Sequence, residues 1–345
     1  MTQADNTTRM FNEAAAAPQV VRHQIEANSE RLLRLGERLR ELNPHAVVTC
    51  ARGSSDNAAT FARYLIETRL HILTSSAAPS VSSVYQAAPN LAGTLFLAIS
   101  QSGASPDLLA AVRAARSAGA LVVALVNAES SPLAHTADFT IPLCAGIERS
   151  VAATKSYIAS LSAIIQLVGC WASDGGPLLE ALAAAPPLLE RAWQLDWNCA
   201  VTYLRTVTDL YVIGRGLGLG IAQEAALKLK ETCGLHAEAI SSAEVRHGPM
   251  ALVRPGFPVL VFTQRDETRS GVEALATELA ARAADVMIAG SNVPGALILP
   301  AEAADPVLEP MLITQSFYRM ANALSLARGL DPDQPPHLQK VTETV

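Results

Sequence analysis

Three charged side chains with the spacing of one helical face are the first candidates for chemistry. Glu224, Lys228 and Glu231 lie three or four residues apart, which places them on the same side of a helix. Downstream come His247, before a Gly-Pro pair, and Lys340, near the C-terminus. Together these groups supply a carboxylate, an imidazole and an amine, which could open a sugar ring and move a proton between neighbouring carbons. Taken singly, they are equally typical of an exposed helix with Glu–Lys pairs and of an ordinary loop histidine.

A serine-rich segment could hold a phosphate group. Residues 100–105 read Ser-Gln-Ser-Gly-Ala-Ser and stand between a strand-like run and a helix. Ser105 suits the N-cap of that helix, Pro106 suits its first position, and Gly119 would end it. Hydroxyls, the Gln101 amide and the free backbone N–H groups of a helix N-terminus are favourable for a phosphate. The alternative is a serine-rich turn with a good helix cap.

Two further serines favour the phosphate interpretation. They follow another strand-like run, and in an open α/β sheet ligands bind where such strand ends meet. The candidate phosphate ligands are therefore Ser54, Ser55, Ser100, Gln101, Ser102 and Ser105.

Composition and missing motifs argue against several other functions. The net charge of -6 argues against a nucleic-acid surface. The glycines of residues 214–220 fail the G-x-G-x-x-G pattern, and no G-x-x-x-x-G-K-[ST] occurs, so no cofactor is expected. The five cysteines form no C-x-x-C, which predicts reduced thiols in a cytoplasmic protein without a zinc site. No signal peptide is visible, and serines and Gln166 interrupt the apolar segment 158–172, which predicts a buried helix and no membrane span.

Short apolar runs alternate with helix-like segments. Residues 11–42 predict one amphipathic helix that ends before Pro44. Strands are expected at 46–50, 95–99 and 121–126, with helices at 58–69 and from Pro106 onward. This order predicts a parallel sheet with helices on both faces.

The pattern recurs 163 residues later. Val47-Val-Thr-Cys-Ala-Arg52-Gly53 matches Val212-Ile-Gly-Arg215-Gly216, and Ile99-Ser-Gln matches Phe262-Thr-Gln at the same offset. The repeat predicts an α/β fold with two tandem doubly wound, flavodoxin-like domains. The expected parts are a helical segment (1–43), a first domain (44–172), a linker (173–206), a second domain (207–330) and a C-terminal tail (331–345).

The order of these motifs resembles the sugar isomerase (SIS) domain family, in particular the isomerase half of glucosamine-6-phosphate synthase. The matching segments are the serine-rich loop, residues 151–155, Lys-Leu-Lys-Glu231, Glu244-Val-Arg-His247-Gly-Pro249 and the tail from Asp331 to Lys340. They span nearly the whole chain in the same order.

The resemblance implies a role for each matched residue. Glu231 would move the proton between C1 and C2, and Lys228 would orient it or balance its charge. His247 would assist ring opening from the neighbouring subunit, which implies a homodimer. Lys340 would close over the sugar as a lid and help to open the ring, either directly or through an imine. The serine-rich residues would hold the sugar phosphate, and the remaining implied sugar contacts are Val151 and Ala153, although the family has a serine at position 153.

The leading hypothesis is an amino-sugar phosphate deaminase that converts glucosamine 6-phosphate to fructose 6-phosphate and ammonia. The family synthase has a glutaminase whose cysteine nucleophile directly follows the initiator methionine, whereas Thr2 stands here. The alternatives are a fructosamine-phosphate deglycase, a galactosamine-6-phosphate deaminase/isomerase, a plain aldose–ketose isomerase or a glutaminase-lacking aminotransferase-like isomerase. A sensor that binds sugar phosphate without chemistry is the alternative from another class. The expected partner is a small sugar phosphate, not a nucleic acid or a membrane.

Overall fold

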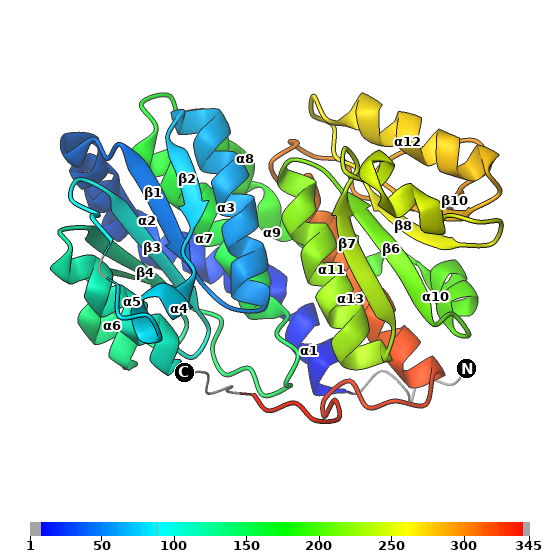
Figure 1. Cartoon of the computed structure of the whole chain (residues 1–345), viewed down its shortest axis with the longest axis horizontal. Helices are drawn as coiled ribbons and strands as arrows, with labels where there is room; N and C mark the ends of the chain where they lie inside the picture. Colours follow the sequence, from blue (N-terminus) through cyan, green and yellow to red (C-terminus); the bar gives the residue numbers. More distant parts are fainter. Residues whose placement is uncertain (1–7, 88, 341–345) are drawn as a thin grey trace. The chain divides into compact units, whose positions relative to one another are not determined.

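The computed structural model describes residues 8–87 and 89–340, and the chain divides into two compact units (Figure 1). The first-sheet unit comprises residues 19–148 and 155–183 together with Gln339 and Lys340. The second-sheet unit comprises residues 8–18, 149–154 and 184–338. Each unit is described by itself below.

The first-sheet unit has five parallel strands in the order β2-β1-β3-β4-β5. This is the flavodoxin-like order, in which ligands bind at the carboxyl ends of β1 and β3. The strands are β1 (Ala46–Cys50), β2 (Leu73–Ser76), β3 (Leu95–Ser100), β4 (Leu121–Val126) and β5 (Phe139–Pro142). The helices are α2 (Ala17–Leu42), α3 (Ser54–Leu70), α4 (Pro79–Ser83), α5 (Pro106–Ser117), α6 (Pro132–Thr136), α7 (Lys155–Trp171) and α8 (Gly176–Ala183).

Helices cover both faces of this sheet because its central strands are apolar on both sides. All six residues of β3 are buried. On one face, Leu108 and Val112 of α5 pack against Phe96 and Val122. α7 is buried along its whole length and packs against α3. The buried helix predicted for residues 158–172 is therefore confirmed.

The second-sheet unit repeats the same topology, with the order β7-β6-β8-β9-β10. The strands are β6 (Asp209–Gly214), β7 (His236–Ser241), β8 (Pro258–Phe262), β9 (Asp285–Ala289) and β10 (Leu297–Leu299). The helices are α1 (Arg9–Ala15), α9 (Ala185–Gln194), α10 (Asn198–Leu204), α11 (Leu217–Cys233), α12 (Arg269–Ala281) and α13 (Glu309–Ala327), with short 3-10 turns at η2 (Val245–His247) and η3 (Pro249–Leu252). α12 covers one face, and α11 packs against α13.

The two sheets confirm the predicted repeat and fold class. β1 begins at Ala46 and β6 at Asp209, while β3 begins at Leu95 and β8 at Pro258, so both pairs are 163 residues apart. The apolar runs in the sequence did not reveal β2, β5, β7 and β10, because these strands are short or half exposed.

The prediction of one continuous helix over residues 11–42 is wrong at one point. The structure has α1 and α2 with a break at Ala16. Pro18 has no N–H to donate to the carbonyl of Ala14, four residues earlier. That carbonyl instead accepts a hydrogen bond from the Gln315 side-chain amide at 3.0 Å. The break thus ties α1 to α13.

No helix among the described residues is long and apolar enough to cross a membrane.

Candidate functional site

The acid–base candidates on α11 form one buried cluster in the second-sheet unit. The Lys228 ammonium lies 2.6 Å from a Glu231 carboxylate oxygen and 3.3 Å from a Glu224 carboxylate oxygen. The Tyr318 hydroxyl of α13 donates to Glu224 at 2.9 Å. The alternative of an exposed helix with surface pairs does not hold, because the Lys228 and Glu224 side chains are only 1% and 0% exposed.

Glu231 is the member of the cluster that can reach a ligand. Its side chain is 21% exposed, whereas its partner Lys228 is buried. A carboxylate held by a buried cation keeps a fixed position while one face remains open. This is the arrangement that a proton-transferring carboxylate requires.

Lys228 remains a cation in this environment. Burial alone would lower its pKa, but the carboxylates of Glu224 and Glu231 outweigh burial and hold the pKa of Lys228 above its ordinary value. Lys228 therefore cannot serve as a base near neutral pH. It can fix the orientation of Glu231 and balance its charge.

His247 lies at the surface of the second-sheet unit. It ends the 3-10 turn η2 and is exposed, and Gly248 follows with φ of 143°. No hydrogen bond or ion pair joins its ring to another residue in the described part of the chain. An exposed imidazole is free to act on a ligand, but the described residues do not bring it to Glu231.

The serine-rich loop occupies the position predicted for it, at the carboxyl end of β3. The backbone N–H of Gly103 donates to Ser100 Oγ at 2.9 Å, and the N–H of Ala104 donates to Ser102 Oγ at 3.4 Å. Ser105 is the N-cap residue of α5, as predicted, but its hydroxyl makes no capping hydrogen bond. The loop thus leaves the Ser105 hydroxyl for a ligand, whereas Pro106 has no N–H and the Leu108 N–H already donates to Asp107 Oδ1 at 2.7 Å.

Gly103 is required by the shape of this loop. Its φ is 62°, and a Cβ atom built at Gly103 would lie 2.2 Å from Ser131 Oγ. Only glycine fits this turn without displacing Ser131.

The second pair of candidate serines follows the neighbouring strand, β1. Ser54 and Ser55 form the first turn of α3, four residues earlier than the helix start expected from the sequence. Since β1 pairs directly with β3, the ends of both strands lie at one edge of the sheet. These residues and the loop therefore meet as predicted.

Arg52 lies at the same edge of the sheet and was not identified as a site residue from the sequence. Its Nε and Nη2 donate to Asp107 Oδ2 at 2.9 and 2.6 Å. Asp107 is buried, whereas the Arg52 side chain is 53% exposed. The guanidinium adds positive charge next to the loop, which favours a phosphate. Its signal in the sequence was its place just after β1, between Cys50 and Gly53.

Lys340 is held by a carboxylate that the sequence did not reveal. Its ammonium lies 3.4 Å from Glu148 Oε2, and the Glu148 side chain is fully buried. Glu148 also accepts the Ser156 hydroxyl at 2.6 Å. The two members of this pair are 192 residues apart in sequence, so no local pattern could have shown it.

The tail before Lys340 is fastened to the fold. The Asp333 carboxylate accepts the backbone N–H groups of Arg9 and Met10, both at 2.8 Å, at the start of α1. The Asp333 carbonyl accepts the N–H of Val151 at 3.4 Å. Deleting the tail from Asp333 onward would remove a helix cap as well as Lys340. Lys340→Met therefore isolates the amine more cleanly.

The candidates fall into two groups. The first-sheet unit holds the phosphate-loop residues, Ser54, Ser55 and Lys340, whereas the second-sheet unit holds Lys228, Glu231 and His247. The segment with half-buried Val151 and Ala153 clusters with the second-sheet unit.

One family of known proteins shares both the sequence and the fold. Residues 42–169 and 203–296 match the family model of the SIS domain. A glutamine–fructose-6-phosphate aminotransferase (isomerizing) of Aeropyrum pernix is 36% identical over 308 residues, which are 84% of this chain and 49% of that protein. The chain thus spans about half the length of the curated relatives that it matches.

Solved structures agree with this match. A candidate phosphosugar isomerase from Silicibacter pomeroyi DSS-3 aligns with a TM-score of 0.90 and 40% identity, covering 94% of this chain and 100% of that chain. The C-terminal domain of glucosamine-fructose-6-phosphate aminotransferase from Francisella tularensis aligns with a TM-score of 0.87 and 26% identity, covering 97% and 100%.

Proposed function

Because this chain belongs to the SIS domain family, we propose that it is a phosphosugar isomerase that acts on an amino sugar. The proposed reaction converts glucosamine 6-phosphate and water to fructose 6-phosphate and ammonia. The observation that carries this proposal is the partly exposed Glu231 carboxylate, held by the buried Lys228 cation. The relatives described above support isomerase chemistry on a sugar phosphate.

The phosphate end of the substrate would bind to the serine-rich loop. The hydroxyls of Ser100, Ser102 and Ser105 and the Gln101 amide supply donors there, with Ser54 and Ser55 in the first turn of α3, after the neighbouring strand. Val151 and Ala153 would contact the sugar. No cofactor is needed for any step.

Ring opening would come first. His247, which we propose comes from the second subunit of a homodimer, would pass a proton from the C1 hydroxyl to the ring oxygen as the C1–O5 bond breaks, giving the C1 aldehyde and the C5 hydroxyl. Lys340 would assist at C1, since a lysine amine can polarise a carbonyl or form an imine with it. Glu148 would position that amine, because it is the buried carboxylate that Lys340 contacts.

Proton transfer would follow at C1 and C2. Glu231 removes the C2 proton, and the electron pair of that C–H bond forms the C1–C2 double bond while the aldehyde oxygen takes up a proton from water. Glu231 then returns the proton to C1 while the C2 amino group loses an N–H proton to water, which leaves a C2 imine. Water adds to this imine and releases ammonia, so that fructose 6-phosphate remains.

Charge in the α11 cluster favours an amino sugar. Two carboxylates contact Lys228, and that of Glu231 is the one partly exposed to a ligand. A carboxylate at this position attracts the ammonium group of glucosamine 6-phosphate.

The direct test is incubation of the purified protein with glucosamine 6-phosphate and measurement of ammonia and fructose 6-phosphate. Glu231→Gln is expected to lower kcat by about 10²- to 10⁴-fold, the usual contribution of a general acid–base group. Ligand binding should change little, because the amide keeps the shape of the carboxylate. Glu278→Gln is the matched control, since it changes a carboxylate of the same unit that pairs with surface arginines.

Wild-type turnover in Glu231→Gln would contradict the assigned role. Isomerisation of a neutral sugar phosphate without ammonia release from the amino sugar would assign the chain to plain aldose–ketose isomerisation. The same assay is run with a fructosamine phosphate and with galactosamine 6-phosphate as substrates. Binding of these ligands without any turnover would favour a sensor. Partial recovery of activity on mixing Glu231→Gln with His247→Ala subunits is expected if His247 acts in the partner subunit.

A further inference from the structure

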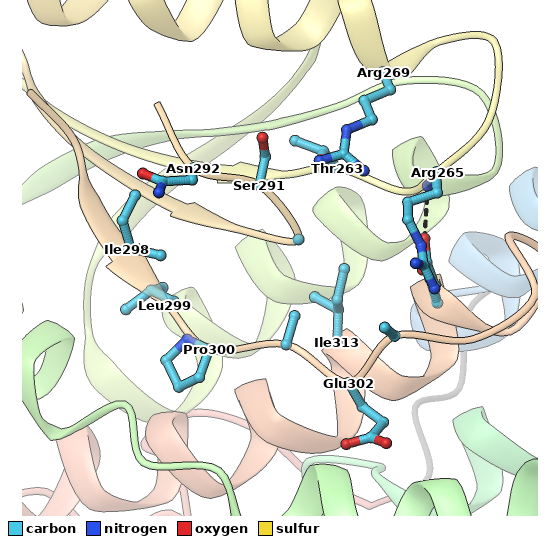
Figure 2. A pocket seen from close by; sticks show the side chains of 14 residues that line it. Thr263, Arg265, Arg269, Ser291, Asn292, Ile298, Leu299, Pro300, Glu302 and Ile313 are labelled. Atoms are coloured by element: carbon cyan, nitrogen blue, oxygen red, sulfur yellow. Dashed lines mark hydrogen bonds and ion pairs between the residues drawn. The ribbon is translucent and has the colours of Figure 1, made fainter. Parts of the chain in front are cut away.

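A second polar cavity lies within the second-sheet unit and contains none of the residues given roles above. Its volume is about 380 Å³, which suits a small organic ligand. It opens at the carboxyl ends of β8, β9 and β10, where Thr263, Gly290 and Leu299 line it (Figure 2). Ligands of open α/β sheets bind at this end of the strands.

Thr263 places an unsatisfied hydroxyl in the wall of this cavity. The residue is 1% exposed, and its Oγ1 has no hydrogen-bond partner among the described residues. Gly290, with φ of 87°, packs closely against Thr263, because a Cβ there would lie 2.1 Å from the Thr263 carbonyl oxygen and 3.1 Å from Thr263 Oγ1. A buried hydroxyl without a partner is unfavourable, so a ligand oxygen at this point would satisfy it.

Two arginines of the lining keep spare donors. Arg269 uses its Nε on Glu273 at 2.6 Å, and its two terminal nitrogens have no partner in the described part of the chain. Arg265 uses its Nε on Glu309 and its Nη2 on the Ala304 carbonyl, which leaves Nη1. A guanidinium with two free amino groups suits the two-point binding of a phosphate.

The acidic residues near the cavity are already neutralised. Glu309 pairs with Arg265 and Glu273 with Arg269. Glu302 pairs with Arg191 at 2.7 Å, and Figure 2 shows its carboxylate pointing away from Thr263. The spare arginine donors are therefore available to an anion.

The remaining lining is suited to a sugar. The amide of Asn292 can contact sugar hydroxyls, and Ser291, whose hydroxyl donates to Glu273, can accept from one. Ile298, Leu299 and Ile313 present an apolar wall to the C–H groups of the sugar. We propose that this cavity is a second hexose-6-phosphate site, distinct from the one that includes the serine-rich loop. It binds without turnover, because its lining contains no histidine or lysine that could open a sugar ring.

The repeat explains why the second copy uses a different location. Thr263 stands 163 residues after Ser100, at the same strand end. Between β6 and β8, however, the Gln264 amide fills the space by donating to the Arg215 carbonyl, Asp266 and Thr268. The position that corresponds to the phosphate loop is thus occupied by protein, and the open space lies toward β9 and β10.

The test is calorimetric titration of the full chain with glucitol 6-phosphate, which has no carbonyl and cannot be turned over. The titrated protein carries Ser102→Ala and Ser105→Ala, which weaken the first site. Thr263→Val in this background should raise the Kd of the remaining site about threefold to tenfold, the loss of one hydrogen bond. Arg269→Gln should raise the Kd about tenfold or more, because it removes a hydrogen bond from a charged donor. Thr263→Ser keeps the hydroxyl and should keep the affinity.

Two controls separate binding from stability. Ser162→Ala removes another buried hydroxyl without a partner, on α7, and should leave this Kd unchanged. Glucitol, which has no phosphate, should not bind at concentrations that saturate the site with glucitol 6-phosphate. A Kd that is unaffected by both Thr263→Val and Arg269→Gln would overturn the proposal, even if Thr263→Val stabilises the fold. The titration does not depend on catalysis, so its outcome is independent of the deaminase assay.

Discussion

The helices α3 and α11 occupy the same position in the two copies of the repeat but bury different side chains. Each has 17 residues, each follows a glycine with positive φ (55° at Gly53, 59° at Gly216), and each ends at a left-handed residue (His71 and Gly234). At the positions of Glu224 and Lys228 in α11, the first copy has Phe61 and Leu65, which are also fully buried. The fold therefore accepts apolar residues where α11 carries a buried ion pair.

This difference shows that packing does not require the charged pair, and it supports the chemical role that we propose for it. Burying two charges costs desolvation free energy that their attraction often only offsets. If α11 were considered alone, packing could explain the buried pair. The equivalent helix α3, however, packs in the same topology without one. The counterpart of Glu231 is Thr68, which has no acid–base function.

The loops after β3 and β8 also differ, but here the candidate site residues lie in the first copy. The first copy has glycine at position 103 and an uncapped serine at position 105. Their counterparts are Asp266 and Thr268, and the Asp266 carboxylate accepts the N–H and hydroxyl of Thr268 at 2.9 and 2.5 Å. The second loop satisfies its own donors and carries the Asp266 carboxylate, so it does not offer the donors that the first loop does. The acid–base candidates therefore lie on α11 of one copy, whereas the serine-rich loop belongs to the other.

The strongest test of this comparison replaces the buried charged residues of α11 with the apolar residues of α3. Lys228→Leu alone leaves Glu224 buried without its cation and should lower the free energy of unfolding by about 3–5 kcal/mol. Adding Glu224→Phe should restore much of that stability, since apolar replacement of a whole buried pair is often neutral or stabilising. Urea unfolding measures both variants. A double variant no more stable than Lys228→Leu would mean that α11 needs the pair to fold.

A smaller effect is expected at the N-cap of α5. Replacing an N-cap serine with alanine usually costs about 1 kcal/mol. Ser105 makes no capping bond, so Ser105→Ala should change stability by less than about 0.5 kcal/mol while raising the Kd for a sugar phosphate about threefold to tenfold. Ser131→Ala is the control, because Ser131 does cap α6 through its side chain. Equal stability losses in the two variants would contradict a ligand role for Ser105.

The smallest expected effect is the pH dependence of the α11 pair. The carboxylates raise the pKa of Lys228 above its ordinary value despite burial. Its contribution to stability should therefore be complete below about pH 10.4, the unfolded value, and decline as the pH rises through the folded pKa. The measurement is the unfolding free energy of the wild type minus that of the Glu224→Phe/Lys228→Leu variant from pH 8 to 11.5. A decline that begins below pH 9 would mean that burial dominates instead.

Local patterns in the sequence were sufficient for much of the fold. The apolar runs located β1, β3 and β4, and Pro106 and Gly119 located α5. Short edge strands escaped because three or four half-exposed residues have no clear pattern. The break at Ala16 escaped because a proline in the first turn of a helix is ordinary, and only Gln315, far along the chain, shows which carbonyl it releases.

The sequence by itself determined the repeat, the fold class and the chemical types of the candidate residues, because these follow from periodicity and from spacing within single elements. Only the tertiary structure decided burial and pairing. It showed that Lys228 and Glu224 are inside while Glu231 remains accessible, and that Glu148 holds Lys340. It also showed that Thr263 Oγ1 has no hydrogen-bond partner among the residues that the structure describes. These properties depend on residues far apart in the chain, so the environment that gives each side chain its chemistry forms only when the chain folds.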